Sequence, residues 1–258
     1  MDLFHSFILG IVEGITEFLP ISSTAHLIIT SQLFGIPQTD FQKFFEVFIQ
    51  AGAILAVVVI YFQYILKHPK IIHKILYSFV PTAVAGLIFY KIIKTIFFES
   101  NSLIIDAIFL IGLVFVILEY LVQKKKIKLV RSVLHLSNLD AIKIGFAQAL
   151  AVVPGVSRSG IVMVAMMFMG FKREDAALYS FLIAVPTILA ASAYDLFKMR
   201  TIVFSSLQNF PLLLVGFVMS FITAYIVVNW FIGFLKKNSL IYFGIYRIAL
   251  AIILMFIF

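Results

Sequence analysis

The stretch that decides the fold is Glu13-Gly-Ile-Thr-Glu17-Phe-Leu-Pro20-Ile-Ser22-Ser23-Thr24-Ala-His26, inside the apolar segment from Phe7 to Phe34. Proline removes a backbone donor and clashes with the preceding helical turn, so a helix through this segment breaks near Pro20. Backbone that is broken at membrane depth is tolerated only where it is buried in protein or lines a wet cavity. We therefore predict a re-entrant helix hairpin here instead of a simple membrane span.

A second broken segment of the same kind runs from Ile144 to Phe168, with Pro154-Gly-Val-Ser157-Arg158-Ser159-Gly160 at its middle. The two segments align without a gap when one is shifted by 135 positions. The shift pairs Gly10 with Gly145, Glu13 with Gln148, Ser22 with Ser157 and Gly35 with Gly170. The chain therefore contains an internal repeat, and each half begins with a re-entrant hairpin.

Six uninterrupted apolar segments are long enough, at about 20 residues each, to cross a bilayer. They run approximately over residues 44–66, 75–98, 103–122, 176–197, 210–231 and 240–258. Each repeat is thus one hairpin followed by three transmembrane helices. Because three is odd, the second repeat enters the membrane from the opposite side. The sequence predicts an all-α polytopic membrane protein with two inverted-topology repeats, an arrangement that places sites at the repeat interface.

The composition agrees with one membrane domain over residues 1–258, since 63% of the residues are hydrophobic and 12% are charged. Soluble domains carry about a quarter charged residues. The absence of cysteine excludes disulfides, iron–sulfur clusters and thiolate catalysis. The net charge of +8 does not indicate nucleic-acid binding, because the basic residues occupy short gaps between apolar runs. The first nine residues show no cleavable signal peptide.

The basic residues also predict the orientation. The richest cluster, from Lys124 to Arg131, separates the two halves, and Lys67, Lys70 and Lys74 fill an earlier gap. Two spans separate these gaps, so both lie on one face, which the positive-inside rule makes cytoplasmic. We predict repeat one over residues 1–123, a basic cytoplasmic linker over 124–140 and repeat two over 141–258. Both termini and the opening of the first hairpin are then outside.

Glu13 and Glu17 are four residues apart, so they share one helix face, and apolar residues surround them. A carboxylate inside the membrane costs about 2.5–3.5 kcal/mol on insertion scales, and two such charges repel each other. A divalent cation bound through carboxylate oxygens relieves the repulsion. A shared proton is the alternative.

The residues after the first break favour nucleophilic chemistry. One of the hydroxyls of Ser22, Ser23 and Thr24 is expected to cap the second half-helix. A serine hydroxyl near a histidine can be activated as a nucleophile, and His26 follows closely. The sequence does not show which serine reaches which partner.

Arg158 in the second break is costly in an apolar environment and therefore faces a cavity or a partner. It begins a half-helix whose free N–H groups favour an anion, and Ser157 and Ser159 flank it. A guanidinium fork, two hydroxyls and a helix N-terminus together make a phosphate site. An ion pair between Arg158 and Glu13 or Glu17 is the alternative, and both can coexist in the free protein.

These two motifs, together with Gln50-Ala-Gly-Ala-Ile-Leu-Ala-Val, closely resemble the undecaprenyl-diphosphate phosphatase family, also called the bacitracin-resistance family. The resemblance covers essentially the whole chain. It implies hydrolysis of undecaprenyl diphosphate to undecaprenyl phosphate and inorganic phosphate at the outer face of a bacterial inner membrane, with a divalent cation, Mg²⁺ or Ca²⁺. The implied catalytic residues are Ser23 as nucleophile, His26, Glu17 and Arg158, with Glu13 and Glu17 at the metal. We expect the phosphate to contact Arg158, Ser157, Ser159, Ser22 and Thr24.

The chain departs from the family pattern at two positions. Ala25 replaces a glycine, and Val162 replaces a threonine whose phosphate contact must be missing or supplied elsewhere, for example by Ser159. Outside the motifs, we expect Asp106, Glu119, Asp175 and Asp195 at membrane interfaces. Arg247 is expected either to snorkel or to pair with a carboxylate.

The expected partners are a polyprenyl diphosphate lipid and the membrane lipids. A homodimer is compatible with the sequence, which does not determine the oligomeric state. The alternative function is a transporter or flippase of a polyprenyl phosphate lipid, because broken helices in inverted repeats are a transporter architecture. A Ser-Ser-Thr-x-His cluster is superfluous for transport, which favours the enzyme.

Overall fold

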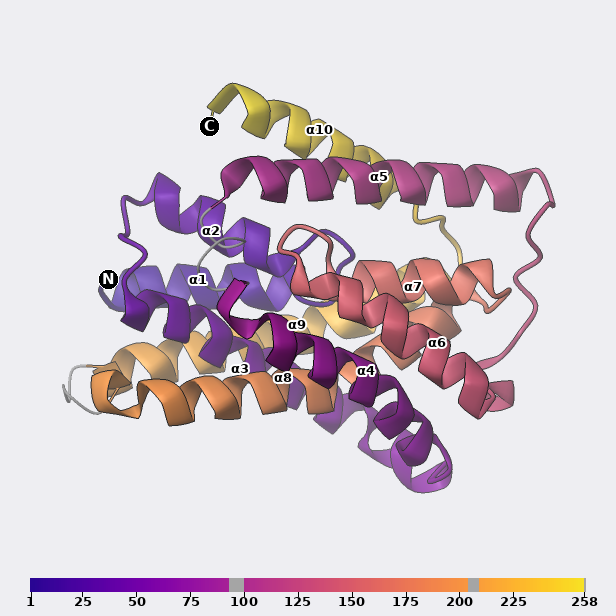
Figure 1. Cartoon of the computed structure of the whole chain (residues 1–258), viewed down its shortest axis with the longest axis horizontal. Helices are drawn as coiled ribbons and strands as arrows, with labels where there is room; N and C mark the ends of the chain where they lie inside the picture. The colour runs from indigo at the N-terminus through magenta and orange to yellow at the C-terminus, as the bar shows by residue number, and fades with distance from the viewer. Residues whose placement is uncertain (93–99, 204–208, 258) are drawn as a thin grey trace.

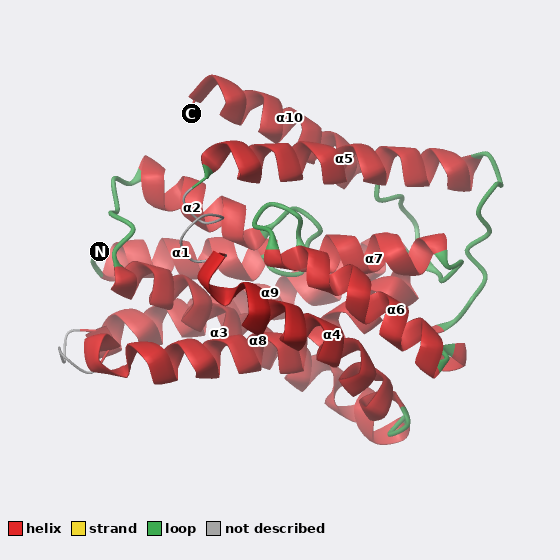
Figure 2. Cartoon of the chain, viewed as in Figure 1, coloured by secondary structure: helices red, strands yellow, loops and turns green. Residues whose placement is uncertain are grey.

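A computed structural model describes residues 1–92, 100–203 and 209–257, and the described elements are helices joined by turns and loops (Figure 2). The first half contains α1 Leu3–Thr16, α2 Ser23–Leu33, α3 Asp40–Lys67, α4 Ile71–Ile92 and α5 Asn101–Gln123. The second half contains α6 Asn138–Ala149, α7 Arg158–Phe168, α8 Arg173–Val203, α9 Asn209–Leu235 and α10 Ile241–Ile257. Two short 3₁₀ helices, Val133–His135 and Leu150–Val152, precede and follow α6. The predicted all-α class is confirmed.

Five of the six predicted spans are helices long and apolar enough to cross a membrane, within the residues that the structure describes: α3, α4, α5, α8 and α9. The sixth, α10, is apolar but has only 17 residues. At 1.5 Å per residue it is about 25 Å long, slightly less than a hydrocarbon core of about 30 Å. The predicted ends of the second and sixth spans, 93–98 and 258, lie outside the described residues.

Both broken segments break where the sequence predicts. Helix α1 ends at Thr16 and α2 begins at Ser23, while α6 ends at Ala149 and α7 begins at Arg158. Ser22 and Ser157, which the 135-residue shift aligns, precede the second half-helices with φ angles of 75° and 71°. Positive φ is uncommon for serine, so its occurrence at both aligned positions supports the repeat. Such backbone costs on the order of 1–3 kcal/mol per residue and is typical of functional sites.

Equivalent helices of the two halves make equivalent contacts. Helix α1 packs on α9, and α6 packs on α4. Both contacts are close: a Cβ added to Gly10 would lie 2.6 Å from the carbonyl oxygen of Gly216, and Gly145 lies directly against the backbone of Ser78. Small residues of this kind let membrane helices approach closely. Figure 1 shows the α1–α2 hairpin opening toward the end that carries both termini and the α6–α7 hairpin opening toward the other end. An inverted repeat predicts this arrangement; its orientation in a membrane stays a prediction.

The basic linker after α5 lies at the end of the molecule opposite the termini (Figure 1). The linker after α5 pairs with the α7–α8 connection there, since the backbone N–H groups of Val130 and Arg131 donate to the carbonyl of Gly170 at 3.0 and 2.9 Å. The Arg131 guanidinium also binds the Asp140 carboxylate at 2.6 Å. Burial raises the pKa of Asp140, but the hydrogen bonds from Ser137 and Arg131 outweigh it and lower that pKa. The linker is thus an ordered part of this end.

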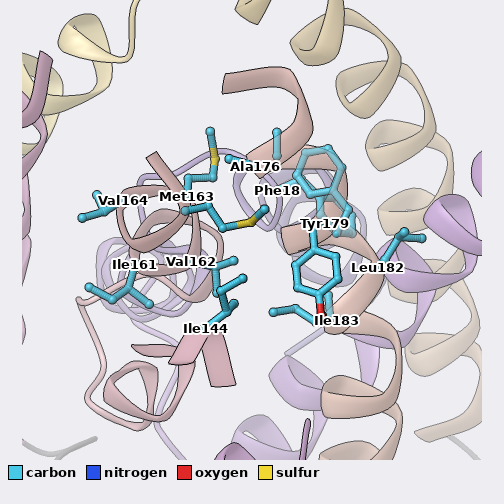
Figure 3. Packing of buried hydrophobic residues seen from close by; sticks show 14 of the residues in the cluster. Phe18, Ile144, Ile161, Val162, Met163, Val164, Ala176, Tyr179, Leu182 and Ile183 are labelled. Atoms are coloured by element: carbon cyan, nitrogen blue, oxygen red, sulfur yellow. The ribbon is translucent and has the colours of Figure 1, made fainter. Parts of the chain in front are cut away.

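The largest apolar cluster surrounds α7 and α8 (Figure 3). Val162 is fully buried in this cluster together with Ile144, Tyr179 and Ile183. A threonine hydroxyl at position 162 would need a partner in these apolar surroundings. Valine therefore fits the core of this chain, and its side chain offers no contact to a phosphate.

Candidate active site

The turns of the two hairpins meet in the interior of the molecule, where the loops lie side by side in Figure 2. The Ser159 hydroxyl at the start of α7 donates to the carbonyl of Leu19 in the first turn at 3.1 Å. Phe18 of the same turn packs edge-to-face on Phe181 of α8, with ring centroids 5.0 Å apart. The two sequence motifs, far apart in the chain, therefore form one site, as their polar residues predict.

Glu17 lies at the centre of the site. One carboxylate oxygen accepts a hydrogen bond from the Ser23 hydroxyl, and the other binds Arg158 Nη2 at 2.5 Å. Arg158 Nη1 also donates to the carbonyl of Ser180 at 3.3 Å. The ion pair that the sequence offers as an alternative for Arg158 is present, and Glu17 is its partner. A phosphate that binds Arg158 must share or displace Glu17.

Glu13 is fully buried one turn before Glu17, and neither of its carboxylate oxygens has a hydrogen-bond partner. An unpartnered buried carboxylate is costly, so the site fits a cation that Glu13 and Glu17 would share. In the described part of the chain no group of three or more His, Cys, Asp and Glu side chains is placed to hold a metal. Mg²⁺ commonly takes one or two carboxylates and fills its remaining positions with water and substrate phosphates, which this pair satisfies.

The hydroxyls around the turns differ in role. The Ser157 hydroxyl caps α7 by accepting from the Gly160 N–H at 3.2 Å, and it lies 3.2 Å from the Ser159 hydroxyl. Ser22 occupies the same position before α2, but its side chain makes no capping hydrogen bond, so the expected hydroxyl cap of α2 is wrong. Thr24 is partly exposed in the first turn of α2. The uncapped N-terminus of α2 presents N–H groups that favour an anion.

His26 points away from Ser23. Its Nδ1–H donates to the carbonyl of Ser22 at 2.7 Å, and its Nε2 lies 2.7 Å from the hydroxyl of Tyr246, whose ring stacks on the imidazole at 5.9 Å. Because a carbonyl only accepts, Nδ1 carries a proton, and Nε2 forms its hydrogen bond with the Tyr246 hydroxyl. The structure brings together Glu17, Ser23 and Arg158 but does not pair His26 with Ser23. Tyr246 is a site neighbour that the motifs do not reveal.

The expectation for Arg247 is wrong, while the expected interface positions of Glu119 and Asp195 stay predictions. Arg247 neither snorkels nor pairs with a carboxylate in the described structure; it is fully buried and donates to backbone carbonyls of both turns and of α5. Glu119 is also fully buried, and binds Arg173 Nε at 2.8 Å and Nη2 at 2.5 Å. It accepts the Leu240 N–H at 2.8 Å as well. Asp195 is buried as well, with 4% of its surface exposed.

A cavity of about 480 Å³ opens beside the second turn. Val153 and Val156 of that turn line it, opposite Leu103, Ala107 and Leu110 of α5. Most of the wall is apolar, although Ser100, Ser102 and Asp106 also line it. Val156 immediately precedes Ser157 in the site. An apolar group that occupies this cavity would therefore lie next to the polar cluster.

These features define a class: a polytopic helical membrane protein whose two broken hairpins enclose a carboxylate, a serine and an arginine in contact. The family model described as "Bacitracin resistance protein BacA" matches residues 6–253. The chain belongs to this family, as its two motifs predict.

The chain is similar in sequence to individual relatives over nearly the full length of each. The chain is 45% identical to an undecaprenyl-diphosphatase of Wolinella succinogenes over 256 residues, covering 99% of this chain and 98% of the relative. It is 43% identical to an undecaprenyl-diphosphatase of Aquifex aeolicus over 253 residues, covering 98% and 97%. A protein of the same name from Campylobacter hominis is 40% identical over 259 residues, covering 99% of each chain.

Proposed function

We propose that this protein hydrolyses undecaprenyl diphosphate to undecaprenyl phosphate and inorganic phosphate. The observation that carries the proposal is the position of Glu17. One of its carboxylate oxygens accepts a hydrogen bond from the Ser23 hydroxyl, and the other accepts one from the Arg158 guanidinium. A nucleophile, a proton acceptor and a phosphate-binding group are thereby in direct contact. The full-length similarity to proteins named undecaprenyl-diphosphatase supports the substrate.

In the reaction we propose, the Ser23 oxygen attacks the terminal phosphorus and its proton passes to Glu17. The bond between that phosphorus and the bridging oxygen breaks, and undecaprenyl phosphate leaves. Water then attacks the phosphoserine, Glu17 returns the proton that it holds to the Ser23 oxygen as the bond between that oxygen and phosphorus breaks, and inorganic phosphate departs with both water protons. Arg158 and the N-termini of α2 and α7 bind the phosphoryl oxygens, since phosphoryl transfer chiefly needs positioned charge. The hydroxyls of Ser157, Ser159 and Thr24 are the further candidates for phosphate contacts.

In this scheme His26 holds the backbone of the first turn in place and does not transfer a proton. Its hydrogen bond to the Ser22 carbonyl holds the residue whose φ is 75°, immediately before the nucleophile. Glu17, not His26, is the group in contact with the Ser23 hydroxyl, so we assign the proton transfer to Glu17.

We propose Glu13 and Glu17 as the protein ligands of a divalent cation, Mg²⁺ or Ca²⁺. When bound, the cation would neutralise charge on the phosphate. The unpartnered oxygens of Glu13 support this assignment. Without a cation, Glu13 and the substrate phosphates would repel each other at close range.

We place the protein in the bacterial inner membrane with the site open to the outer side. The basic loops, which include the linker and Arg173, lie at the end opposite the termini, and the positive-inside rule makes that end cytoplasmic. The prenyl chain would lie along the apolar wall of the cavity between α5 and the second turn, beside Val156 and away from Asp106. This placement explains why a hydrolytic site is embedded among membrane helices.

The proposal is tested by measuring phosphate release from undecaprenyl diphosphate with purified protein in detergent, with and without a chelator. We expect cation-dependent release that Arg158→Ala abolishes. If Ser23→Ala retains release, water attacks directly and serine is not the nucleophile. A folded wild-type protein that releases no phosphate would contradict the enzyme and leave transport of a lipid phosphate.

A further inference from the structure

Arg247 of α10 is the largest fully buried side chain in the described part of the chain. Its Nε donates to the carbonyl of Ile108 in α5 at 3.2 Å, and Nη1 donates to that of Pro20 at 3.1 Å. Nη2 donates to the carbonyl of Gly155 at 2.5 Å, with longer contacts of 3.4 Å to those of Ala107 and Val156. One guanidinium therefore joins α5, the first turn and the second turn.

The three turn carbonyls that accept from Arg247 belong to the backbone that positions the residues of the site. Pro20 precedes Ser22, and Gly155 and Val156 precede Ser157, the two serines with positive φ. Gly155 itself has a φ of 94°, and a Cβ at this position would lie 2.5 Å from the carbonyl oxygen of Ile104. Neither turn is held by a regular helical ladder, so its position depends on contacts such as these.

The chemistry of arginine suits this task. Its planar guanidinium carries five N–H donors in a rigid fork, so it can bind several carbonyls in fixed directions. Lysine keeps the charge but offers a compact ammonium on a flexible stem, which does not hold two separate turns in the same geometry. Helix α10 is itself close to α5, because a Cβ on Gly112 would lie 3.0 Å from the Cβ of Arg247.

We infer that Arg247 is a positioning residue that fixes the two turns relative to each other, so that Ser23 and Arg158 converge on Glu17. It touches neither Glu17 nor the reacting groups, and it acts through the backbone of both hairpins. The neighbouring Tyr246 strengthens the same connection, since it binds His26 of α2. The inference rests on the proposed function for its activity readout.

The test compares Arg247→Lys and Arg247→Met with wild type in the phosphate-release assay, over a range of substrate concentrations. We expect Arg247→Lys to lower kcat by about 100-fold, because a displacement of about 1 Å at a reacting group has this effect. KM should change by less than about threefold, since Arg158 and the helix N-termini remain. Hydrogen exchange of wild type and variant should show faster exchange in residues 18–23 and 153–159 of the variant, with α9 unchanged.

Arg173→Lys is the control, because Arg173 is likewise an arginine held by specific hydrogen bonds, although it is only partly buried and lies at the start of α8, outside the turns. It should lower the unfolding temperature and leave kcat at the wild-type value. If Arg247→Lys keeps wild-type kcat, or loses activity only in proportion to its unfolded fraction, the inference is wrong. If Arg247→Met does not fold, the Lys variant carries the test. Wild-type protein without phosphatase activity would contradict the proposed function alone, and hydrogen exchange would still test the role of Arg247.

Discussion

Arg158 and Glu17 bind each other at 2.5 Å across the two hairpins, although 141 residues separate them in the chain. The pair is almost closed to solvent, with 12% and 5% of the two side chains exposed. In this arrangement Glu17 occupies a position on Arg158 that a phosphate oxygen would take. The Arg158–Glu17 pair is therefore neutral in the free site, and a substrate phosphate must share Arg158 with Glu17 or displace it.

Glu17→Gln should separate phosphate binding from catalysis. The variant loses the carboxylate that competes for Arg158 and repels phosphate, so we expect inorganic phosphate to inhibit it at about tenfold lower concentration. It also loses the acceptor of the Ser23 proton, so kcat should fall by about 100-fold or more. Product-inhibition kinetics measure both quantities. Weaker phosphate inhibition in Glu17→Gln than in wild type would contradict the competition between Glu17 and phosphate.

Ser23→Ala should lower kcat by about 1000-fold or more, because it removes the nucleophile. Rapid acid quenching of wild type with substrate labelled in the terminal phosphate should leave label on the protein, and the Ser23→Ala protein should carry none. Ser6→Ala is the matched control, since Ser6 is a buried serine of α1 whose hydroxyl has no partner. Labelled Ser23→Ala protein would show that another residue is the nucleophile.

The sequence predicts the broken helices and the polar cluster because both arise from local chemistry. Pro20 and Pro154, each followed by small polar residues, lie where the helices break, whereas Pro81 and Pro186 stay inside α4 and α8. The 135-residue shift aligns Ser22 with Ser157, which share their backbone conformation. Intramembrane Glu17 and Arg158 need polar partners, and each is the other's partner. The end of α1 and the start of α7 follow from the same reasoning.

The contacts that the sequence does not predict join segments without a shared local pattern. Arg247 reaches carbonyl oxygens, which every residue carries, so no residue type marks its partners. The partner of His26, Tyr246, lies 220 residues away and is one of ten tyrosines. Glu119 lies near the end of an apolar segment, and only the packing of α5, α8 and α10 shows that it is buried.

Glu119→Ala should destabilise the protein without altering the chemistry of the site. Breaking a buried ion pair by removing one partner costs about 3–5 kcal/mol, and here Arg173 and the Leu240 N–H both lose their acceptor. Thermal unfolding in detergent should show a clearly lower midpoint, while kcat per folded molecule stays at the wild-type value. Exposed Asp106→Ala should change the midpoint little. A Glu119→Ala protein as stable as wild type would mean that the buried pair contributes nothing to stability.

Glu13→Gln should reveal the cation without reference to activity. In wild type, added Mg²⁺ or Ca²⁺ should raise the unfolding midpoint, because a ligand that binds only the folded state stabilises it by mass action. Glu13→Gln should lose this response, since one of the two carboxylates is gone. Without added cation the variant should be at least as stable as wild type, because it no longer buries an unpartnered carboxylate beside Glu17. Glu46→Gln is the control: Glu46 is also a buried carboxylate, but one of its oxygens accepts from Ser31, Gln38 and Gln42, and only the other has no partner. Its cation response should equal that of wild type. An unchanged response in Glu13→Gln would place the cation elsewhere and leave the shared proton as the explanation for the Glu13–Glu17 pair.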